Sequence, residues 1–282
     1  MEFIIRNIKP LDFNFIIRLA ELENIRYSNK DLNRIIDFEP DGCFIALDGE
    51  RRLGIVTTIT YGNVGWIGNL LVDKSTRRRG TGTNLIREAI EYMQKKDVKV
   101  PKLYCFPKRI PFYRGLGFKP EINLQVMTMK GKKISFSEVK QLSEEELHEM
   151  SLLDKKIFGA DRSRLLCRIH QEFPENCFAA YHKKKLVGYI MASGSEDEYE
   201  LGPWICLPKY QNRYAEQLLR AGINSLDSKK IDLSTPLHNM ITENILTKYD
   251  LRKQGIAVRM GCKDSSLGDI ESVLGIAGLD KG

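Results

Sequence analysis

The chain repeats itself, and this repeat restricts its fold more than any other feature. A shift of 134 residues aligns the sequence with itself without a gap over about forty positions. Identical residues fall in segments that we expect to share secondary structure: Cys43 and Cys177, Phe44 and Phe178, Ala46 and Ala180, Gly54 and Gly188, Gly68 and Gly202, Arg79 and Arg213, and Leu85 and Leu219. We therefore predict a duplicated unit. The length of 282 residues also favours two domains, which we place at residues 1–131 and 132–282.

Hydrophobic periodicity predicts the same kind of unit in each half. In the first half it favours helices after Pro10, around 32–36, at 85–96 and at 110–116, and strands near 3–8, 43–47, 53–60, 66–72, 103–106 and 121–129. The second half begins in the same way, with a strand expected at 134–139 and a capping box formed by Ser143 and Glu146. We expect an α/β fold of the α+β type with a mixed sheet. It would consist of two tandem domains, each a mostly antiparallel sheet flanked by helices.

A basic, glycine-containing run joins strand 66–72 to the following helix. Arg77, Arg78 and Arg79 stand directly before Gly80 and Gly82. The first turn of a helix offers unpaired N–H groups and the positive end of the helix dipole. Residues without a Cβ atom also let an anion approach the backbone closely. We interpret the run as a cradle for a phosphate or pyrophosphate group, and the alternative is a solvated basic turn before an ordinary helix.

Two familiar phosphate-binding motifs do not fit this run. A P-loop requires a lysine after its last glycine, and the dinucleotide fingerprint requires a third small residue where this chain has Leu85. The repeat offers a comparison, because Gly80 aligns with Tyr214 and Gly82 aligns with Glu216. A tyrosine side chain would crowd a pyrophosphate, and a carboxylate in the first helical turn would repel it. We therefore predict that only the first half keeps the cradle.

The spacing Arg77-x-x-Gly80-x-Gly82 resembles the coenzyme A signature of the GNAT acetyltransferase superfamily, Arg/Gln-x-x-Gly-x-Gly/Ala. The second half resembles, over most of its length, the C-terminal domain of the YitH-like tandem acetyltransferases. The matching stretches are Asp161-Arg162-x-x-Leu165-Leu166, Leu186-Val187-Gly188-Tyr189, Leu201-Gly202-Pro203-Trp204 and Arg259-Met260. The Gly-Phe pair usual in the superfamily is replaced there by Asp250-Leu251.

The resemblance implies the transfer of an acetyl group from acetyl-CoA to a primary amine of an unidentified small molecule or peptide. It also implies a coenzyme site made of Leu70, Leu71, Val72, Arg77, Arg78, Arg79, Gly80, Thr81, Gly82 and Thr83. The N–H groups of residues 78–83 would hold the pyrophosphate. The end of strand 66–72 would bind the pantetheine arm and supply an amide to the thioester oxygen, where charge develops in the transition state.

The same resemblance implies that Tyr113 is the acid that protonates the departing thiolate. Tyr113 stands four residues before Gly117-Phe118, as in the superfamily's later motif. A phenol with a pKa near 10 suits reprotonation of a thiol group with a pKa near 8.5. The alternative is a tyrosine that only packs on a short helix.

No single residue of the sequence stands out as the general base. Candidates for the base are Glu21, Glu23 and Glu39, although a surface carboxylate is the better explanation of each, and a water chain could serve instead. The acidic run at residues 196–200 could attract a cationic amine if it faced the first domain, or it could be a solvated loop. Trp204 could line the same cleft or lie in the core. Because no base stands out, an acyl-CoA-binding sensor or assembly module without transferase activity is the alternative function.

The distribution of charge restricts the classes of molecule that the chain is expected to bind. Residues 1–131 have 22 basic and 15 acidic residues, so the whole net charge of +7 lies in the half with the cradle. This suits a polyanionic coenzyme and would suit nucleic acid. We do not expect nucleic acid, however, because no basic helix face or basic tail accompanies the charge.

Cysteine and hydropathy patterns predict the compartment. The six cysteines form no Cys-x-x-Cys motif and none pairs with a histidine at metal spacing, so we expect reduced thiols and no metal site. No apolar run reaches about 18 residues, and residues 1–6 do not resemble a signal peptide. We expect a cytoplasmic protein without a membrane partner, and the oligomeric state stays open.

Overall fold

The computed structural model describes residues 3–237, 239–262 and 268–282, so Met1 and Glu2 of the segment considered as a leader lie outside it. The helices and strands of the first half are β1 (Ile4–Asn7), α1 (Phe13–Glu21), α2 (Asn29–Phe38), β2 (Phe44–Asp48), β3 (Arg51–Tyr61), β4 (Val64–Val72), α3 (Thr81–Lys95), β5 (Val100–Cys105), α4 (Ile110–Arg114) and β6 (Lys119–Lys130). Those of the second half are β7 (Val139–Gln141), α5 (Leu147–Phe158), α6 (Ser163–Glu172), β8 (Phe178–His182), β9 (Lys185–Ser195), β10 (Glu198–Cys206), α7 (Gln211–Ser225), β11 (Lys230–Pro236), α8 (Met240–Leu246), β12 (Arg252–Gly261) and β13 (Val273–Gly275).

The sequence repeat is also a repeat of structure. The pairs α2 and α6, β2 and β8, β3 and β9, and β4 and β10 each begin and end 134 residues apart. The predicted capping box is present, since the N–H of Ser143 donates to Glu146 Oε2 at 3.0 Å. The two halves therefore share one framework, and differences between them at equivalent positions are informative.

One predicted strand is wrong. Residues 134–138 are not in a strand, and the first strand of the second half is β7. The apolar side chains of Ile134 and Phe136 pack on the core of the second half. The backbone meets side-chain acceptors of α7 instead of another strand, because Ile134 N–H donates to Asn224 Oδ1 and Ser137 N–H donates to Gln217 Oε1.

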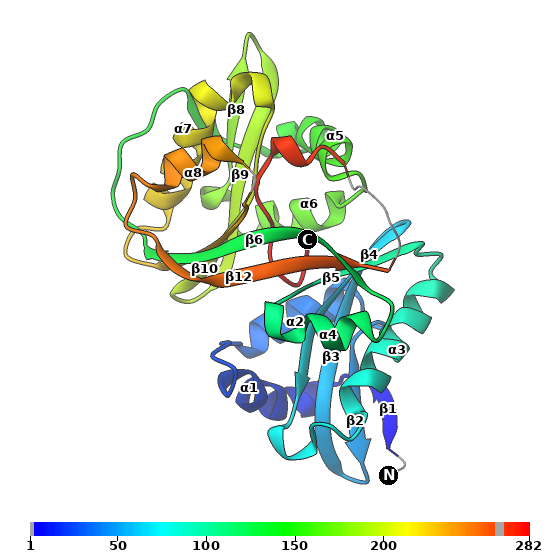
Figure 1. Ribbon diagram of the computed structural model, residues 1–282. Helices are drawn as coiled ribbons and strands as arrows, with labels where there is room; N and C mark the ends of the chain where they lie inside the picture. The colour runs from blue at the N-terminus through cyan, green and yellow to red at the C-terminus, as the bar shows by residue number, and fades with distance from the viewer. Residues whose placement is uncertain (1–2, 238, 263–267) are drawn as a thin grey trace.

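The strands form one continuous sheet in the order β1-β2-β3-β4-β5-β12-β6-β11-β10-β9-β8-β7, and β13 pairs with β10. Only the pairs β4–β5 and β10–β11 are parallel among the described strands, so the prediction of a mixed, mostly antiparallel sheet flanked by helices is confirmed. The halves also exchange strands at the centre of the molecule (Figure 1). There β12 pairs with β5, β6 pairs with β11, and β6 and β12 pair with each other.

A buried charge cluster fastens this exchange. Glu121 of β6 binds both Lys102 of β5 and Arg259 of β12, with 2.7 Å between Arg259 Nε and Glu121 Oε2. The Lys102 side chain is fully buried, and burial lowers its pKa even though Glu121 counteracts the shift. The cluster thus joins three neighbouring strands that come from both halves.

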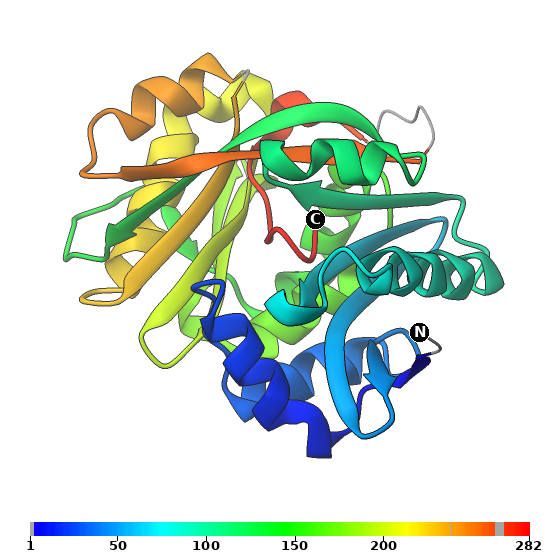
Figure 2. The same cartoon turned by 60° about the horizontal axis from the view of Figure 1, so that its bottom comes forward.

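The segment after β13 runs between the two halves (Figure 2). The carbonyl oxygen of Gly282 accepts a hydrogen bond from Arg162 at 2.9 Å, and Arg162 also forms a buried ion pair with Asp154. The hydroxyl of Tyr61 in β3 donates to the carbonyl oxygen of Lys281 at 2.8 Å. These contacts fix the segment between the two halves of the repeat.

In the described part of the chain, every helix is too short or too polar to cross a lipid bilayer.

Candidate active site

The site begins where β4 and β5 separate. The two strands pair in parallel only as far as Ile67 and Leu103, whereas β4 continues to Val72. A bulge in β4 follows at once, and it includes Asn69 with a φ of 51°. The last residues of β4, among them Leu70 and Leu71, therefore border an open wedge on the β5 side, while Leu71 still pairs with Ile55 of β3 on the other side.

The predicted cradle is a loop that ends at the N-terminus of α3. Arg78 has a φ of 63°, and Gly80, the N-cap residue, has a φ of 87° that favours glycine. No side chain of the described residues caps this end of the helix. Among the described residues, no acceptor takes a hydrogen bond from the N–H groups of residues 78–83. A row of free N–H groups at the positive end of a long helix is a site for an anion.

Gly82 shows that the cradle and the end of β4 belong to one site. A Cβ atom on Gly82 would lie 3.6 Å from Phe112 of α4, 3.6 Å from Val72 and 3.9 Å from Leu70. These are ordinary contact distances, so packing within the protein does not require glycine here. The absence of a side chain instead leaves the backbone open toward the wedge, which fits a bound coenzyme.

Arg77 does not point into this cradle. Its Nε donates to the carbonyl oxygen of Val72 at 3.0 Å, and its guanidinium forms an ion pair of 2.6 Å with Glu23. The hydrogen bond from Arg77 lowers the pKa of Glu23. Arg77 therefore fixes the loop to β4, and Glu23 is paired and ionised, which makes it a poor base. Arg78 and Arg79 are exposed beside the free N–H groups.

The second half keeps the hydrogen bond from the position of Arg77 to the end of the preceding strand, but it lacks the cradle. Gln211, the equivalent of Arg77, donates to the carbonyl oxygen of Cys206, the equivalent of Val72, at 2.9 Å. The helix α7 begins at Gln211, however, so that the residues aligned with the cradle loop are helical. Tyr214, at the position of Gly80, is buried and lies 3.2 Å from His182 Nδ1. Glu216, at the position of Gly82, binds Lys248 at 2.5 Å.

Tyr113 lies in α4, in the same apolar cluster as Leu70 and Val72 from the end of β4. Its ring is 8% exposed and packs edge-on against Phe112 and Phe118, with centroid distances of 4.9 and 6.1 Å. Burial raises its pKa above the ordinary value of 10. Its hydroxyl has no hydrogen-bond partner in the described part of the chain, and it is not among the fully enclosed polar atoms. Tyr113 is thus a protonated phenol with its proton uncommitted.

The other carboxylates proposed as a base are placed differently. Glu39 is 5% exposed and accepts hydrogen bonds from the N–H and hydroxyl of Thr60 and from the hydroxyl of Tyr92. It therefore stabilises the fold. Glu21 is exposed at the end of α1.

Sequence reasoning missed the residues around the β4 bulge. The amide of Asn69 accepts a hydrogen bond from Tyr27 at 2.6 Å and donates to Thr57 at 3.0 Å and to Asp280 at 3.4 Å. An asparagine at the end of an apolar strand is a weak signal of a bulge. No sequence signal connects it with Asp280, which is 211 residues away.

The acidic run of the second half divides between surface and interior. Asp197 is exposed and binds Lys229, and Glu198 binds Arg26 at 3.2 Å. Glu200 instead points to the boundary between the halves, where it binds Lys281 at 3.1 Å. Trp204 is fully buried in the core of the second half, so it does not line a cleft.

Comparisons with known proteins identify the family of the chain. A family model described as the acetyltransferase (GNAT) family matches residues 13–118, and one described as the acetyltransferase (GNAT) domain matches residues 150–275. The Bacillus subtilis protein YitH, an uncharacterized N-acetyltransferase, is 24% identical over 198 residues, which cover 67% of this chain and 68% of YitH.

Solved structures show the same fold over nearly the whole chain. A Pyrococcus horikoshii protein assigned as an acetyltransferase has a TM-score of 0.82 at 20% identity, covering 99% of this chain and 96% of that one. A tandem GNAT protein from the clavulanic acid biosynthesis pathway has a TM-score of 0.65 at 14% identity, covering 94% and 100%. Both family models describe GNAT proteins, and together they span most of the chain. The chain therefore belongs to the GNAT acetyltransferases, as an acyltransferase built from two GNAT domains in tandem.

Proposed function

We propose that this protein is an N-acetyltransferase that moves an acetyl group from acetyl-CoA to a primary amine, and that the coenzyme binds to the first half only. The observation that carries the proposal is the row of unpaired N–H groups at residues 78–83 beside the open end of β4. The exposed guanidinium groups of Arg78 and Arg79 add positive charge at the same place. A pyrophosphate with an extended arm fits both parts of this arrangement.

Each part of the site has a role in this proposal. The N–H groups of residues 78–83 bind the pyrophosphate, and Leu70, Leu71 and Val72 line the pantetheine arm. An N–H group at the end of β4 donates to the thioester oxygen and stabilises the charge that develops there. Tyr113 gives its proton to the thiolate as it departs. The coenzyme supplies the activated acetyl group.

We propose that the second domain, taken as residues 132–282, shapes the acceptor site and binds no coenzyme. Its helix α7 begins four residues earlier, relative to the repeat, than α3 does. The side chains of Tyr214 and Glu216 then occupy the positions at which the first half has glycine. The acceptor is a small molecule or a peptide, and the amine is its reacting group.

Calorimetric titration with acetyl-CoA tests the proposal. We expect one site per chain, and we expect Gly82→Glu to abolish measurable binding because a carboxylate would stand in the first turn of α3. Gly82→Ala is the matched control, because a Cβ atom there meets only ordinary contacts, and it should retain binding. Two sites per chain, or unchanged affinity in Gly82→Glu, would refute the proposal. Binding without CoA release across a broad panel of amines would favour a sensor or assembly module instead.

A further inference from the structure

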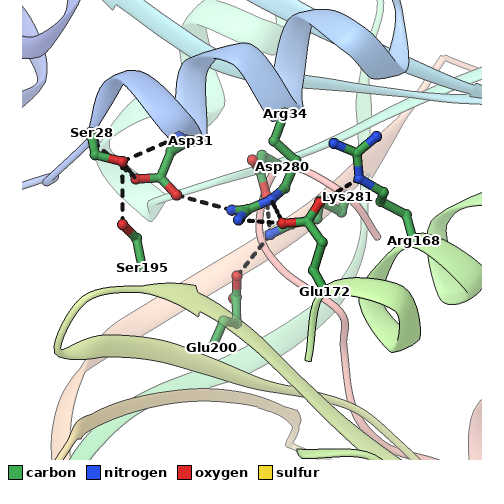
Figure 3. A network of polar contacts seen from close by, with 9 residues as sticks. All are labelled: Ser28, Asp31, Arg34, Arg168, Glu172, Ser195, Glu200, Asp280 and Lys281. Carbon is green, nitrogen blue, oxygen red and sulfur yellow. Dashed lines mark hydrogen bonds and ion pairs between the residues drawn. The ribbon is translucent and has the colours of Figure 1, made fainter. Parts of the chain in front are cut away.

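An ammonium group of the chain itself lies where the two halves meet. Lys281 Nζ is 3.1 Å from Glu200 Oε2 and 3.0 Å from Asp280 Oδ1, and Figure 3 shows the three side chains together. Glu200 comes from β10 of the second half. Burial lowers the pKa of Lys281, but Asp280 and Glu200 outweigh it, so the net shift is upward and the group is charged. Two carboxylates thus already hold one primary ammonium group.

This pair of carboxylates reaches the wedge between β4 and β5. Asp280 Oδ2 accepts a hydrogen bond from Asn69 in the β4 bulge, and a Cβ atom on Gly68 would lie 2.7 Å from Asp280 Cβ. Gly68 directly follows Ile67, the last residue of β4 that pairs with β5. Asp280 therefore lies at the apex of the wedge, whereas the cradle follows the far end of β4.

An unused hydroxyl and a small cavity adjoin Lys281. Ser193 of β9 pairs across the sheet with Glu200 and is only 8% exposed. Its hydroxyl has no hydrogen-bond partner in the described part of the chain, and its oxygen is not among the fully enclosed polar atoms. Ser193, Asp280 and Lys281 line one cavity of about 40 Å³, together with residues of α2, β3 and α6. An unpartnered hydroxyl of a largely buried residue that lines a cavity is available to a ligand or a water there. The cavity holds a few waters at most, so an acceptor can enter only if Lys281 moves.

We propose that Glu200, Asp280 and the Ser193 hydroxyl form the subsite that binds the primary ammonium group of the acceptor, and that Lys281 occupies this subsite until the acceptor displaces it. The inference rests on the proposed acetyltransferase function. It narrows the acceptor to alkylammonium compounds, either free or as the lysyl side chain of a peptide. Lys281 is itself such a group, and it shows that the subsite accommodates one.

Glu200 is also suited to accept the proton that an ammonium must lose before it attacks. Burial raises the pKa of Glu200 to about 7, Lys281 counteracts the rise, and Asp280 and Asp232 of β11 add to it. The hydroxyl of Tyr27 also interacts with Glu200. In this step an N–H bond of the ammonium breaks, an O–H bond forms on Glu200, and the nitrogen keeps its lone pair for the attack. The proton then passes from Glu200 to solvent.

Ligand-observed NMR with n-butylamine tests the subsite without any coenzyme. Lys281→Met removes the internal ammonium at similar side-chain length, so we expect it to bind n-butylammonium at least about ten-fold more tightly than the unmodified chain does. Adding Glu200→Gln to Lys281→Met should remove the gain. Lys248→Met, which breaks another lysine–carboxylate pair in the second half, is the matched control and should change nothing. Equal affinity in Lys281→Met and the unmodified chain, or a gain that survives Glu200→Gln, would overturn the proposal.

Kinetics with acetyl-CoA and n-butylamine give a second readout. We expect kcat/KM of the unmodified chain to rise with pH through about 7, and to rise at higher pH in Lys281→Met, because the cation that lowers the pKa of Glu200 is gone. Calorimetry with acetyl-CoA on the same variants separates the proposed subsite from the proposed function.

Intact coenzyme binding with identical amine kinetics in all variants overturns the subsite alone. If the unmodified chain does not bind the coenzyme, the proposed acetyltransferase function is overturned as well. A peptide with the sequence of residues 278–282 serves as a second acceptor. A KM for this peptide below that for n-butylamine supports a lysyl side chain as the acceptor, and a KM above it supports a free small-molecule amine.

Discussion

At the scale of single residues, the proposed mechanism requires Tyr113 to give its proton to the departing thiolate. Its buried ring keeps the phenol protonated at neutral pH, because burial raises the pKa above 10. A thiolate formed in the wedge would be a strong acceptor for that proton. We expect Tyr113→Phe to lower kcat by about 100-fold with acetyl-CoA and n-butylamine, while the Kd for acetyl-CoA changes less than about two-fold.

Stopped assays of CoA release and calorimetry on the same preparation check this expectation. Tyr249→Phe is a suitable control, because its hydroxyl contacts Glu216 in the second half, away from the cradle. Undiminished turnover in Tyr113→Phe would remove this residue from the mechanism and leave it a packing role.

The residues of the site divide into those that sequence can predict and those that it cannot. Gly80 and Gly82 were predictable because an anion cradle is local, and its glycines, arginines and helix start lie within a few positions. Arg77 stands in the same motif, yet its side chain binds Glu23, 54 positions away, which spacing alone does not indicate. Glu200 and Lys281 are 81 residues apart, and only the folded chain brings them together.

At the scale of secondary structure, Glu121 determines how firmly the exchanged strands are held. Glu121→Gln would leave Lys102 and Arg259 on neighbouring strands without their shared counter-charge, and Lys102 is fully buried. Breaking one partner of a buried ion pair is strongly unfavourable, so we expect the free energy of unfolding to fall by about 3 kcal/mol. Denaturant titration followed by circular dichroism measures the loss.

A matched change in an exposed ion pair provides the comparison. Glu138→Gln breaks the surface pair of Glu138 with Arg213 and should have little effect, because exposed pairs contribute little. A loss in Glu121→Gln no greater than that in Glu138→Gln would show that the cluster does not stabilise the exchange.

Strand exchange also marks where prediction from sequence ends. The alternation of apolar residues predicted β6 as a strand, and it is one. Its neighbours were not predictable, because an apolar face can pack equally well against the sheet of either half. The pairing of β12 with β5 and of β6 with β11 depends on contacts between residues far apart in the chain, among them the cluster around Glu121.

At the scale of the whole molecule, equivalent residues of the two repeats meet at the interface between the halves. Arg34 of α2 and Arg168 of α6 are equivalent positions, and both bind the carboxylate of Glu172, with 2.6 Å between Arg34 Nη2 and Glu172 Oε2 (Figure 3). The three side chains line the same cavity as Lys281. The interface between the halves and the proposed acceptor subsite are therefore one region, so a change in how the halves fit together should affect the acceptor and spare the coenzyme.

Glu172→Gln tests this connection between the interface and the acceptor. Burial raises the pKa of Glu172, but Arg34 and Arg168 outweigh it and hold the pKa below its usual value. The carboxylate therefore stabilises the fold at neutral pH, and this contribution is lost as the pH falls through the lowered pKa. We expect Glu172→Gln to lower the free energy of unfolding at pH 7 by about 2 kcal/mol and to speed hydrogen exchange in α2 and α6. The KM for n-butylamine should rise while the affinity for acetyl-CoA stays unchanged.

Asp37→Asn, which alters an exposed carboxylate 3.7 Å from Arg168, is the control for Glu172→Gln. A variant with faster exchange in α2 and α6 but an unchanged KM for the amine would show that the interface and the acceptor site are independent.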